Sequence, residues 1–371
     1  MKLYEYMAKE YFRKVGIVTP EGRVAASPEE AAAIAREIGR PVAIKSQVLT
    51  GGRGKAGGIK FAASPEEARQ VAQELLHSQI RGLPVKQVLV EEKLSIDREL
   101  YLGFTVDGAA RKPLLIASSQ GGVNIEEVPE KDLVKHHISI TWGLMPFMAR
   151  SIARRLGLTA GLARQFTDLA VRLYRLFRDM DAELTEINPL VVSGDRLVAA
   201  DGRLNVDSDA LFRHQDIPVT SELTAIEARV KEIGLSYVEL GGDIAVMANG
   251  AGITMATIDI LEQHGGSAMN FLDAGGGASV EPMARALEVL VSTQPKAILI
   301  NIFGGITRCD DVAKAIIQVK KTQGIPVPLV VRLVGTNEAE GVRLLQAEGI
   351  QAFSSMDEAA QRVVALARGE A

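Results

Sequence analysis

The pattern of hydrophobic and polar positions changes at about residue 235. In the first part, stretches with apolar residues three and four apart, the spacing of an amphipathic helix, mix with β-like runs in no regular order. Several β-like runs follow one another without a helix, which favours antiparallel pairing and an α+β domain over residues 1–235. The predicted helices are 5–15, 28–38, 65–77, 146–156 and 162–179, and the predicted strands are 42–48, 59–63, 87–92, 100–106, 113–118, 184–192 and 196–201.

From residue 236 onward, β-like runs and helical stretches alternate strictly. The runs are continuously apolar, as expected for strands whose two faces are both covered. This pattern predicts an α/β domain with a doubly wound parallel sheet over residues 236–371, joined to the first domain through residues 215–235. The predicted strands are 244–248, 270–274, 297–303, 329–333 and 352–354, and the predicted helices are 255–263, 282–291, 312–319, 338–348 and 357–367.

The loop at residues 51–58 reads Gly-Gly-Arg-Gly-Lys-Ala-Gly-Gly and lies between two predicted strands. Glycines without Cβ let backbone N–H groups approach an anion, and Arg53 and Lys55 add positive charge. The composition therefore suits a loop that covers phosphates, although a solvated glycine-rich turn would have the same pattern.

Two familiar phosphate motifs do not fit this loop. Gly52, Gly54 and Gly57 match G-x-G-x-x-G, but a strand follows where the dinucleotide fingerprint requires a helix. Ala56 stands where a P-loop requires Ser or Thr after Gly-Lys. The remaining interpretation is a hairpin lid over a nucleotide.

A second hairpin brings oxygen ligands together. A two-residue turn at Gly194-Asp195 would place Asn188 opposite Asp201, with Glu186 on the same face two residues along. An amide oxygen and carboxylates make a site suited to Mg²⁺ bound with nucleotide phosphates. An ordinary solvated polar face remains the alternative, and one extra turn residue would break the register.

Single residues at strand ends add to the nucleotide interpretation. Lys45 ends a predicted strand, where its ammonium could meet a phosphate as a point charge or simply extend to solvent. Glu91 ends the strand 87–92, and the acidic linker after it could present backbone groups to a purine and a carboxylate to a ribose. A strand ending in a charged loop would look the same.

Three glycine turns follow strands of the second domain, at 249–252, 275–277 and 304–307. Each leads into a predicted helix. Because ligands of open α/β sheets bind at the carboxyl ends of strands, where helix N-termini present free N–H groups, we expect a phosphate site here. Tight turns without a ligand would explain any one of the three.

Composition narrows the class of protein. The formal net charge of −4 gives no basic surface for nucleic acid. No apolar run approaches the ~20 residues that span a membrane, and the charged N-terminal stretch is not a signal peptide. A single cysteine, Cys309, excludes an intrachain disulfide, so we expect a cytoplasmic protein without membrane or nucleic-acid partners.

The chain offers no convincing nucleophile. It has no G-x-S-x-G sequence, its five histidines lack metal or triad spacing, and Cys309 has no evident base nearby. A nucleotide site without an acceptor suggests that the reacting group comes from another chain.

The landmarks of the sequence, in order, are LYEYMAKEYF, GGRGKAGG, ELYLG, LTEINPLVV, DGRLNVD, ALFR, VMANGAGITMATIDI, NFLDAGGGAS and NIFGGITRCD. Together they resemble, over essentially the whole chain, the β subunits of succinyl-CoA synthetase (succinate–CoA ligase, ADP- or GDP-forming). The resemblance implies an ATP-grasp nucleotide-binding domain followed by a flavodoxin-like CoA-ligase domain that contacts an α subunit. That α subunit binds CoA and carries the histidine that becomes phosphorylated, in an αβ or α2β2 assembly.

The resemblance also implies a reaction and its residues. Succinyl-CoA, phosphate and a nucleoside diphosphate give succinate, CoA and the triphosphate through succinyl phosphate and phosphohistidine, as in the tricarboxylic acid cycle. ATP/ADP or GTP/GDP is the nucleotide and Mg²⁺ the metal. The implied positions are Lys45, Gly52, Arg53, Gly54, Glu91, Leu94 and Glu99 for the nucleotide, Asn188 and Asp201 for Mg²⁺, Glu186 as the catalytic residue beside the phosphohistidine, and Asn249, Gly305, Ile306 and Thr307 for substrate and phosphate.

Three other functions stay open at this point. A related acid–CoA ligase, such as malate–CoA ligase, would share these motifs because acid specificity also depends on the absent chain. A non-catalytic nucleotide-binding subunit is disfavoured by the intact set Lys45, Asn188, Asp201 and Glu186. A dinucleotide oxidoreductase is the third.

Overall fold

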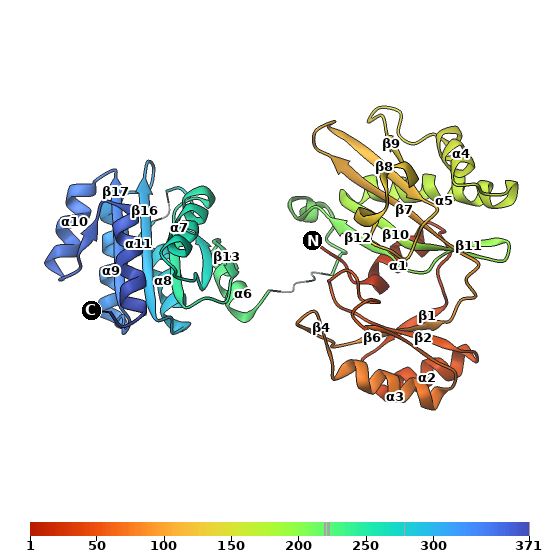
Figure 1. Cartoon of the computed structure of the whole chain (residues 1–371), viewed down its shortest axis with the longest axis horizontal. Helices are drawn as coiled ribbons and strands as arrows, with labels where there is room; N and C mark the ends of the chain where they lie inside the picture. The colour runs from red at the N-terminus through yellow and green to blue at the C-terminus, as the bar shows by residue number, and fades with distance from the viewer. Residues whose placement is uncertain (219, 221–222, 278, 371) are drawn as a thin grey trace. The chain divides into compact units, whose positions relative to one another are not determined.

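The structure is a computed structural model that describes residues 1–218, 220, 223–277 and 279–370. The chain forms two compact units, Met1–Glu222 and Leu223–Ala371 (Figure 1). This division lies before the boundary expected at residue 235, because helix α6 (Ala225–Glu232) packs its apolar side into the core of the second unit. The predicted connection at 215–235 is thus partly helical, and its residues 219, 221 and 222 lie outside the described residues.

A small antiparallel sheet forms the lower half of the first unit in Figure 1, in the order β1-β6-β2-β3. Helices α2 and α3 pack on it around a shared apolar core. Both helices begin with a serine N-cap, since the Ser27 and Ser64 hydroxyls each accept a backbone N–H bond three residues on, at 3.2 Å. The elements are β1 (Gly22–Ala25), α2 (Pro28–Ile38), β2 (Val42–Ser46), β3 (Ile59–Ala62), α3 (Pro65–Leu76) and β6 (Val88–Glu92), with a separate pair β4 (Gln79–Ile80) and β5 (Leu83–Pro84).

A larger antiparallel sheet forms the rest of the first unit, in the order β11-β10-β7-β8-β9, with β12 also paired to β10. The expected antiparallel pairing is present, but the strands of the described part of this unit divide between these two sheets and the separate β4-β5 pair, because the sequence pattern does not say which strands pair. The core of this part includes side chains of α1, α4 and α5. The elements are α1 (Glu5–Lys14), β7 (Arg98–Asp107), β8 (Lys112–Ser118), β9 (Leu133–His137), α4 (Pro146–Arg155), α5 (Ala160–Asp179), β10 (Ala182–Ser193), β11 (Arg196–Ala199) and β12 (Arg203–Val206), with short 3-10 helices at Ile125–Glu127, Glu130–Asp132 and Ser208–Arg213.

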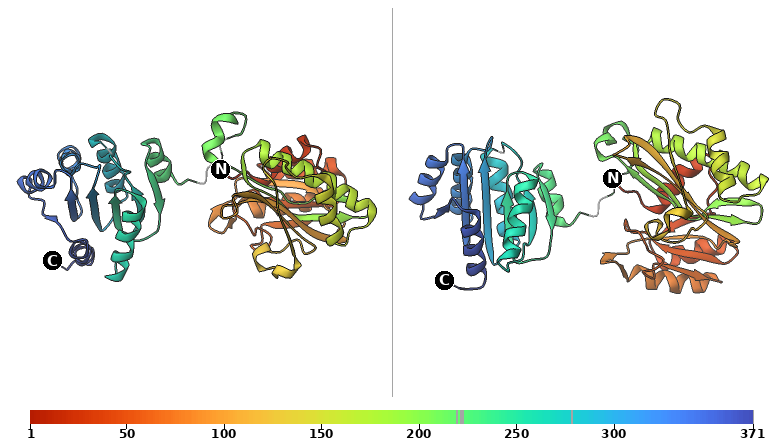
Figure 2. Two further views of the ribbon diagram at one scale, coloured as in Figure 1. Left: turned by 90° about the horizontal axis from the view of Figure 1, so that it is seen from above. Right: turned by 45° about the horizontal axis from the view of Figure 1, so that its top comes forward.

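The second unit is built on a sheet in the order β13-β15-β14-β16-β17-β18, with helices on both faces (Figures 1 and 2). From β14 to β18 the strands are parallel and follow the flavodoxin-like order. Strand β13 differs from the expected all-parallel sheet, because it pairs antiparallel with β15 at the edge. The elements are β13 (Ser236–Glu239), β14 (Ile244–Ala248), α7 (Ala251–Gln263), β15 (Asn270–Asp273), α8 (Val280–Ser292), β16 (Ala297–Gly304), α9 (Cys309–Thr322), β17 (Leu329–Gly335), α10 (Glu338–Ala347), β18 (Ala352–Phe353) and α11 (Met356–Ala367).

Two separate apolar cores cover this sheet. Helices α8, α9 and α10 pack on one face, and α7 and α11 pack on the other. The glycine turns therefore emerge where three neighbouring parallel strands, β15, β14 and β16, all end.

Candidate functional site

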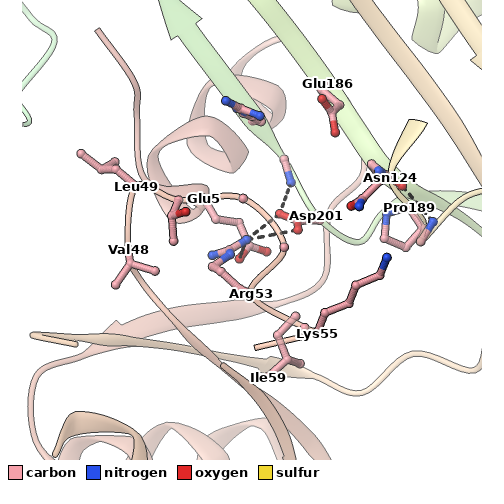
Figure 3. Close-up of a pocket in the computed structure, with 18 of the residues that line it drawn as sticks. Glu5, Val48, Leu49, Arg53, Lys55, Ile59, Asn124, Glu186, Pro189 and Asp201 are labelled. Carbon is pink, nitrogen blue, oxygen red and sulfur yellow. Dashed lines mark hydrogen bonds and ion pairs between the residues drawn. The ribbon is translucent and has the colours of Figure 1, made fainter. Parts of the chain in front are cut away.

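A cleft of about 220 Å³ lies in the first unit, between the glycine loop and the β10 hairpin (Figure 3). Residues from segments far apart in the sequence line it, including the start of α1 and the loop at 122–124. Of the residues expected to act in this domain, the cleft is lined by Gly52, Arg53, Gly54, Glu186, Asn188 and Asp201.

The glycine loop connects two strands, as its sequence pattern indicates. Lys45 of β2 pairs with Ile59 of β3 in an antiparallel register, so the loop closes a hairpin. Gly52 and Gly57 have φ values of +70° and +76°, a backbone conformation that favours glycine. The turn directs Arg53 back into the protein, where its side chain is buried.

Arg53 joins the loop to the β10 hairpin region. Its Nη2 donates to the Asp201 carboxylate at 2.9 and 3.1 Å (Figure 3). Its Nη1 donates to the Ser46 carbonyl at 3.1 Å. The same Nη2 lies 2.8 Å from Glu5 Oε2. Burial would lower the pKa of Arg53, but the Glu5 and Asp201 carboxylates raise it, so the guanidinium stays charged.

Lys45 is buried at the end of β2, next to the cleft. Its Nζ lies 2.5 Å from Glu91 Oε1 and 3.1 Å from Glu5 Oε1, and it donates to the Ala200 carbonyl at 2.6 Å. Burial would lower the pKa of Lys45, but the Glu5 and Glu91 carboxylates raise it. A permanent positive charge therefore stands beside the cleft.

Sequence reasoning missed Glu5 and Lys9, which complete this cluster from helix α1. Their side chains are 0% and 1% exposed, and Lys9 Nζ lies 2.7 Å from Glu5 and 2.6 Å from Glu91. Burial would raise the pKa of Glu5, but the surrounding cations hold it well below its usual range. The available signal was an acid and a base four residues apart on the same helix face as Ala8 and Phe12, an apolar face.

The β10–β11 hairpin has the register that a two-residue turn predicts, since Ser193 pairs with Arg196. The same register, continued beyond the paired residues, places Asn188 opposite Asp201. Both residues line the cleft. Asn188 Oδ1 accepts a hydrogen bond from the Gly122 backbone N–H at 2.8 Å, which fixes the orientation of the amide.

These oxygens fit a magnesium ion that also binds phosphates. Among the described residues, no three His, Cys, Asp or Glu side chains come together as a metal-binding group. Asn188 and Asp201 would thus supply two oxygens, and phosphates and water the others, which is the manner in which proteins usually hold Mg²⁺ with a nucleotide.

Glu186 lies on β10 opposite Gly103 of β7 and Arg203 of β12. The hydroxyl of Tyr101 fills the space above Gly103, 2.6 Å from where a Cβ would stand. Burial raises the pKa of Glu186, and Arg203 opposes that shift. Burial and the Glu186 charge also raise the pKa of Tyr101, which keeps its phenol protonated as a donor to Glu186. Sequence reasoning missed Tyr101 and Arg203.

The other residues expected to bind the nucleotide do not line the cleft. Glu91 is buried against Lys9 and lines a smaller pocket beside α1. Glu99, at the start of β7, lies against Gly122, which does line the cleft. Leu94 is half-buried in the segment between β6 and β7.

In the second unit, side-chain hydrogen bonds tie the three glycine turns together. The Asn249 amide donates to the Phe303 carbonyl at 3.0 Å and accepts from its N–H at 2.9 Å. The Thr307 hydroxyl accepts from the Gly277 N–H at 3.0 Å. Ile306 projects from the same place and is 80% exposed. The structure therefore brings together the turns after β14, β15 and β16.

The sequence matches the family of ATP-grasp domains over residues 2–192 and the CoA-ligase family over residues 247–366, which confirms the expected order of folds. Relatives named succinate–CoA ligase [ADP-forming] subunit beta align along the full chain. That of Methanothermobacter thermautotrophicus is 48% identical over 373 residues, covering 99% of this chain and 100% of its own. Those of Chloroflexus aurantiacus and Ignicoccus hospitalis are 47% and 44% identical, covering 100% and 99% of this chain and 100% of their own.

Among solved structures, ATP citrate lyase from Methanothrix soehngenii, in complex with citrate and coenzyme A, superposes with a TM-score of 0.79. It is 20% identical and covers 100% of this chain and 99% of that chain, a likeness of fold. No helix in the described part of the protein is both long and apolar enough to cross a membrane.

Proposed function

The chain belongs to the family of succinate–CoA ligase β subunits, and from this premise we propose how its residues divide the reaction with an α subunit. It is a ligase subunit with a nucleotide as substrate. The observation that carries the proposal is the placement of buried Arg53 and Lys45 beside a cleft that also holds Glu186, Asn188 and Asp201.

The overall reaction has three steps. Phosphate attacks succinyl-CoA, giving succinyl phosphate and CoA. A histidine of the α subunit takes the phosphoryl group and releases succinate. The phosphohistidine then donates that group to the diphosphate, giving the triphosphate and the free histidine, so charge and atoms balance.

In the first unit, positioning and charge neutralisation carry the last step. Lys45, Arg53 and the N–H groups of Gly52 and Gly54 bind the nucleotide phosphates. Asn188 and Asp201 hold Mg²⁺, which supplies charge neutralisation at the phosphates. Glu186 is the catalytic carboxylate beside the α-subunit histidine. Glu91, Leu94 and Glu99 surround the nucleoside.

In the second unit, the turns at the carboxyl ends of the strands bind the substrate side of the reaction. Helix N-termini attract anions there, and this supports roles for Asn249 and for Gly305, Ile306 and Thr307 in holding phosphate or succinate at the junction with the α subunit. CoA is bound mainly by the α subunit.

We further propose the domain assignment and the setting. The first unit is the ATP-grasp nucleotide-binding domain, and the second unit, which includes α6, is the flavodoxin-like CoA-ligase domain that contacts the α subunit. The assembly is αβ or α2β2, the protein is cytoplasmic, and ADP or GDP accepts the phosphoryl group.

The test is to co-express the chain with its α subunit and to assay succinyl-CoA formation with ATP and GTP in parallel, with malate as a competing acid. We expect succinate to be activated, and Lys45→Ala and Asp201→Asn each to lower the rate at least tenfold. Activation of malate over succinate, or full activity of the Lys45→Ala complex at limiting nucleotide, would contradict the proposal.

A further inference from the structure

Glu5 is surrounded by cations yet has no part in the reaction described above. Lys9 and Lys45 lie 2.7 and 3.1 Å from its Oε1, and Arg53 lies 2.8 Å from its Oε2. Its side chain is 0% exposed, although Glu5 is one of the residues that line the cleft. Figure 3 shows Glu5 beside Arg53 and Asp201.

The two carboxylate oxygens of Glu5 differ in their hydrogen bonding. Oε1 is the atom nearest to both lysines and accepts a hydrogen bond from Lys45. Oε2 is buried and accepts no hydrogen bond in the described structure, although Arg53 Nη2 is within contact distance. The N–H groups of Arg53 are aligned instead with Asp201 and the Ser46 carbonyl. Glu5 therefore keeps one open acceptor directed at Arg53, which is unusual for a buried carboxylate.

Arg53 and a metal compete for the same carboxylate. Both oxygens of Asp201 accept from Arg53 Nη2 in this structure. If Asp201 binds Mg²⁺ as proposed, Arg53 must give up part of this contact when the metal arrives with the nucleotide. A buried guanidinium that loses a carboxylate is costly unless another acceptor stands ready.

We propose that Glu5 is a positioning residue that supplies this second acceptor: it receives Arg53 as Mg²⁺ takes Asp201, and so keeps the guanidinium at the phosphates. The inference rests on the proposed function, because it needs Asp201 as a metal ligand. Lys9 has a supporting part. It pairs with Oε1 of Glu5 and with Glu91, and so leaves Oε2 of Glu5 to face Arg53.

The experiment is ADP binding to the assembled enzyme by calorimetry, with Mg²⁺ and again with EDTA. The quantity of interest is the ratio of the two dissociation constants. Glu5→Gln should reduce the gain that Mg²⁺ gives by about tenfold or more, the effect of one hydrogen bond to a charged group. Binding in EDTA should change little, since Arg53 can then remain on Asp201.

Glu10→Gln is the matched control, since it makes the same substitution at an exposed position of the same helix. If Glu5→Gln does not fold, Glu5→Asp provides the test, because it keeps the buried charge but shortens the side chain that reaches Arg53. Glu5→Asp should also reduce the gain in ADP affinity that Mg²⁺ gives. An unchanged ratio, or equal weakening with and without Mg²⁺, would overturn the inference.

Asp201→Asn separates this inference from the proposed function. Loss of the Mg²⁺ effect in Asp201→Asn with an unchanged ratio in Glu5→Gln would defeat the role of Glu5 alone. A normal Mg²⁺ effect in Asp201→Asn would instead remove the metal assignment and with it the reason for Arg53 to move.

Discussion

At the scale of single residues, the cleft holds a carboxylate whose ionisation carries a cost. Burial raises the pKa of Glu186, and the charge of Asp201 adds to the effect. A carboxyl group with a raised pKa binds its proton more tightly in the folded than in the unfolded state, so its contribution to stability falls as pH rises through the folded pKa.

Glu186→Gln should therefore raise the thermal midpoint of unfolding at neutral and alkaline pH. The gain should vanish below about pH 4, where an ordinary glutamate is also protonated. The same change should slow phosphoryl transfer from the α subunit by about 10²–10³-fold, the usual effect of removing a catalytic charge or donor. Thermal unfolding from pH 4 to 8 and single-turnover transfer measure the two effects; a lower midpoint at every pH would contradict the first.

Tyr101→Phe tests the donor beside Glu186. Loss of the phenol removes a hydrogen bond that favours the ionised carboxylate, so the pKa of Glu186 should rise further and the acid limb of the transfer rate should move to higher pH. The rate on the alkaline side should change little. Tyr174→Phe removes a hydroxyl from another buried tyrosine of the same unit, and its pH profile should match that of the unchanged enzyme.

At the scale of elements, the glycines of the β2–β3 loop differ in backbone conformation and in the space around them. Gly52 has φ of +70°, and a Cβ there would lie 2.6 Å from Arg81 Nη2. Gly54 has no positive φ, and its nearest neighbour would be Ile59 Cδ1 at 3.7 Å, an ordinary contact. Of these two glycines, Gly52 is the one that the fold of the loop requires.

Gly52→Ala should destabilise the first unit by about 1 kcal/mol, the strain of a left-handed alanine. Gly54→Ala should leave stability within about 0.5 kcal/mol but weaken ADP binding, because a phosphate approaching the backbone would meet the new methyl group. Denaturant unfolding and calorimetry check the pair. Normal ADP affinity of Gly54→Ala would mean that the nucleotide does not approach this glycine closely.

At the scale of the whole molecule, the proposed reaction requires a second chain, and we expect exposed apolar side chains of the second unit to contact it. Ile306 is 80% exposed and Phe303 is 57% exposed, both beside the glycine turns. Burying an exposed isoleucine at an interface contributes about 1.5–3 kcal/mol.

Ile306→Asp should therefore weaken association with the α subunit at least tenfold while the isolated chain binds ADP normally. Val106→Asp, at a 56% exposed position of β7, is the control for adding a surface charge. Analytical ultracentrifugation with the α subunit provides the measurement, and unaltered association of Ile306→Asp would exclude this residue from the interface.

The parts of this picture that sequence could predict depend on local rules. The hairpin register followed from turn length alone, because paired residues across a two-residue turn are fixed by arithmetic. The helices predicted at 28–38 and 65–77 are present, and their N-caps, Ser27 and Ser64, obey local capping chemistry. The residue pattern predicted an α+β domain followed by an α/β domain, whereas the names of the two folds and most residue roles came from resemblance to a family.

The parts that sequence missed depend on tertiary environment. Polar residues on a helix are assumed to face water, so Glu5 was not recognised as a buried partner of Arg53, nor Lys9 as a buried partner of Glu5 and Glu91. The antiparallel edge strand β13 was missed because it is short and alternation predicted parallel neighbours. In each case the outcome depends on which distant segment packs over the residue, and the local sequence does not contain that information.

Cys309, at the start of α9, can report on unfolding of the second unit. It is the only cysteine of the chain, it is fully buried, and burial raises the pKa of its thiol to about 11. Since thiol reagents attack the exposed thiolate, they should label the native protein slowly and the opened second unit quickly. The labelling rate would thus report the unfolding of the second unit alone, because the first unit contains no cysteine.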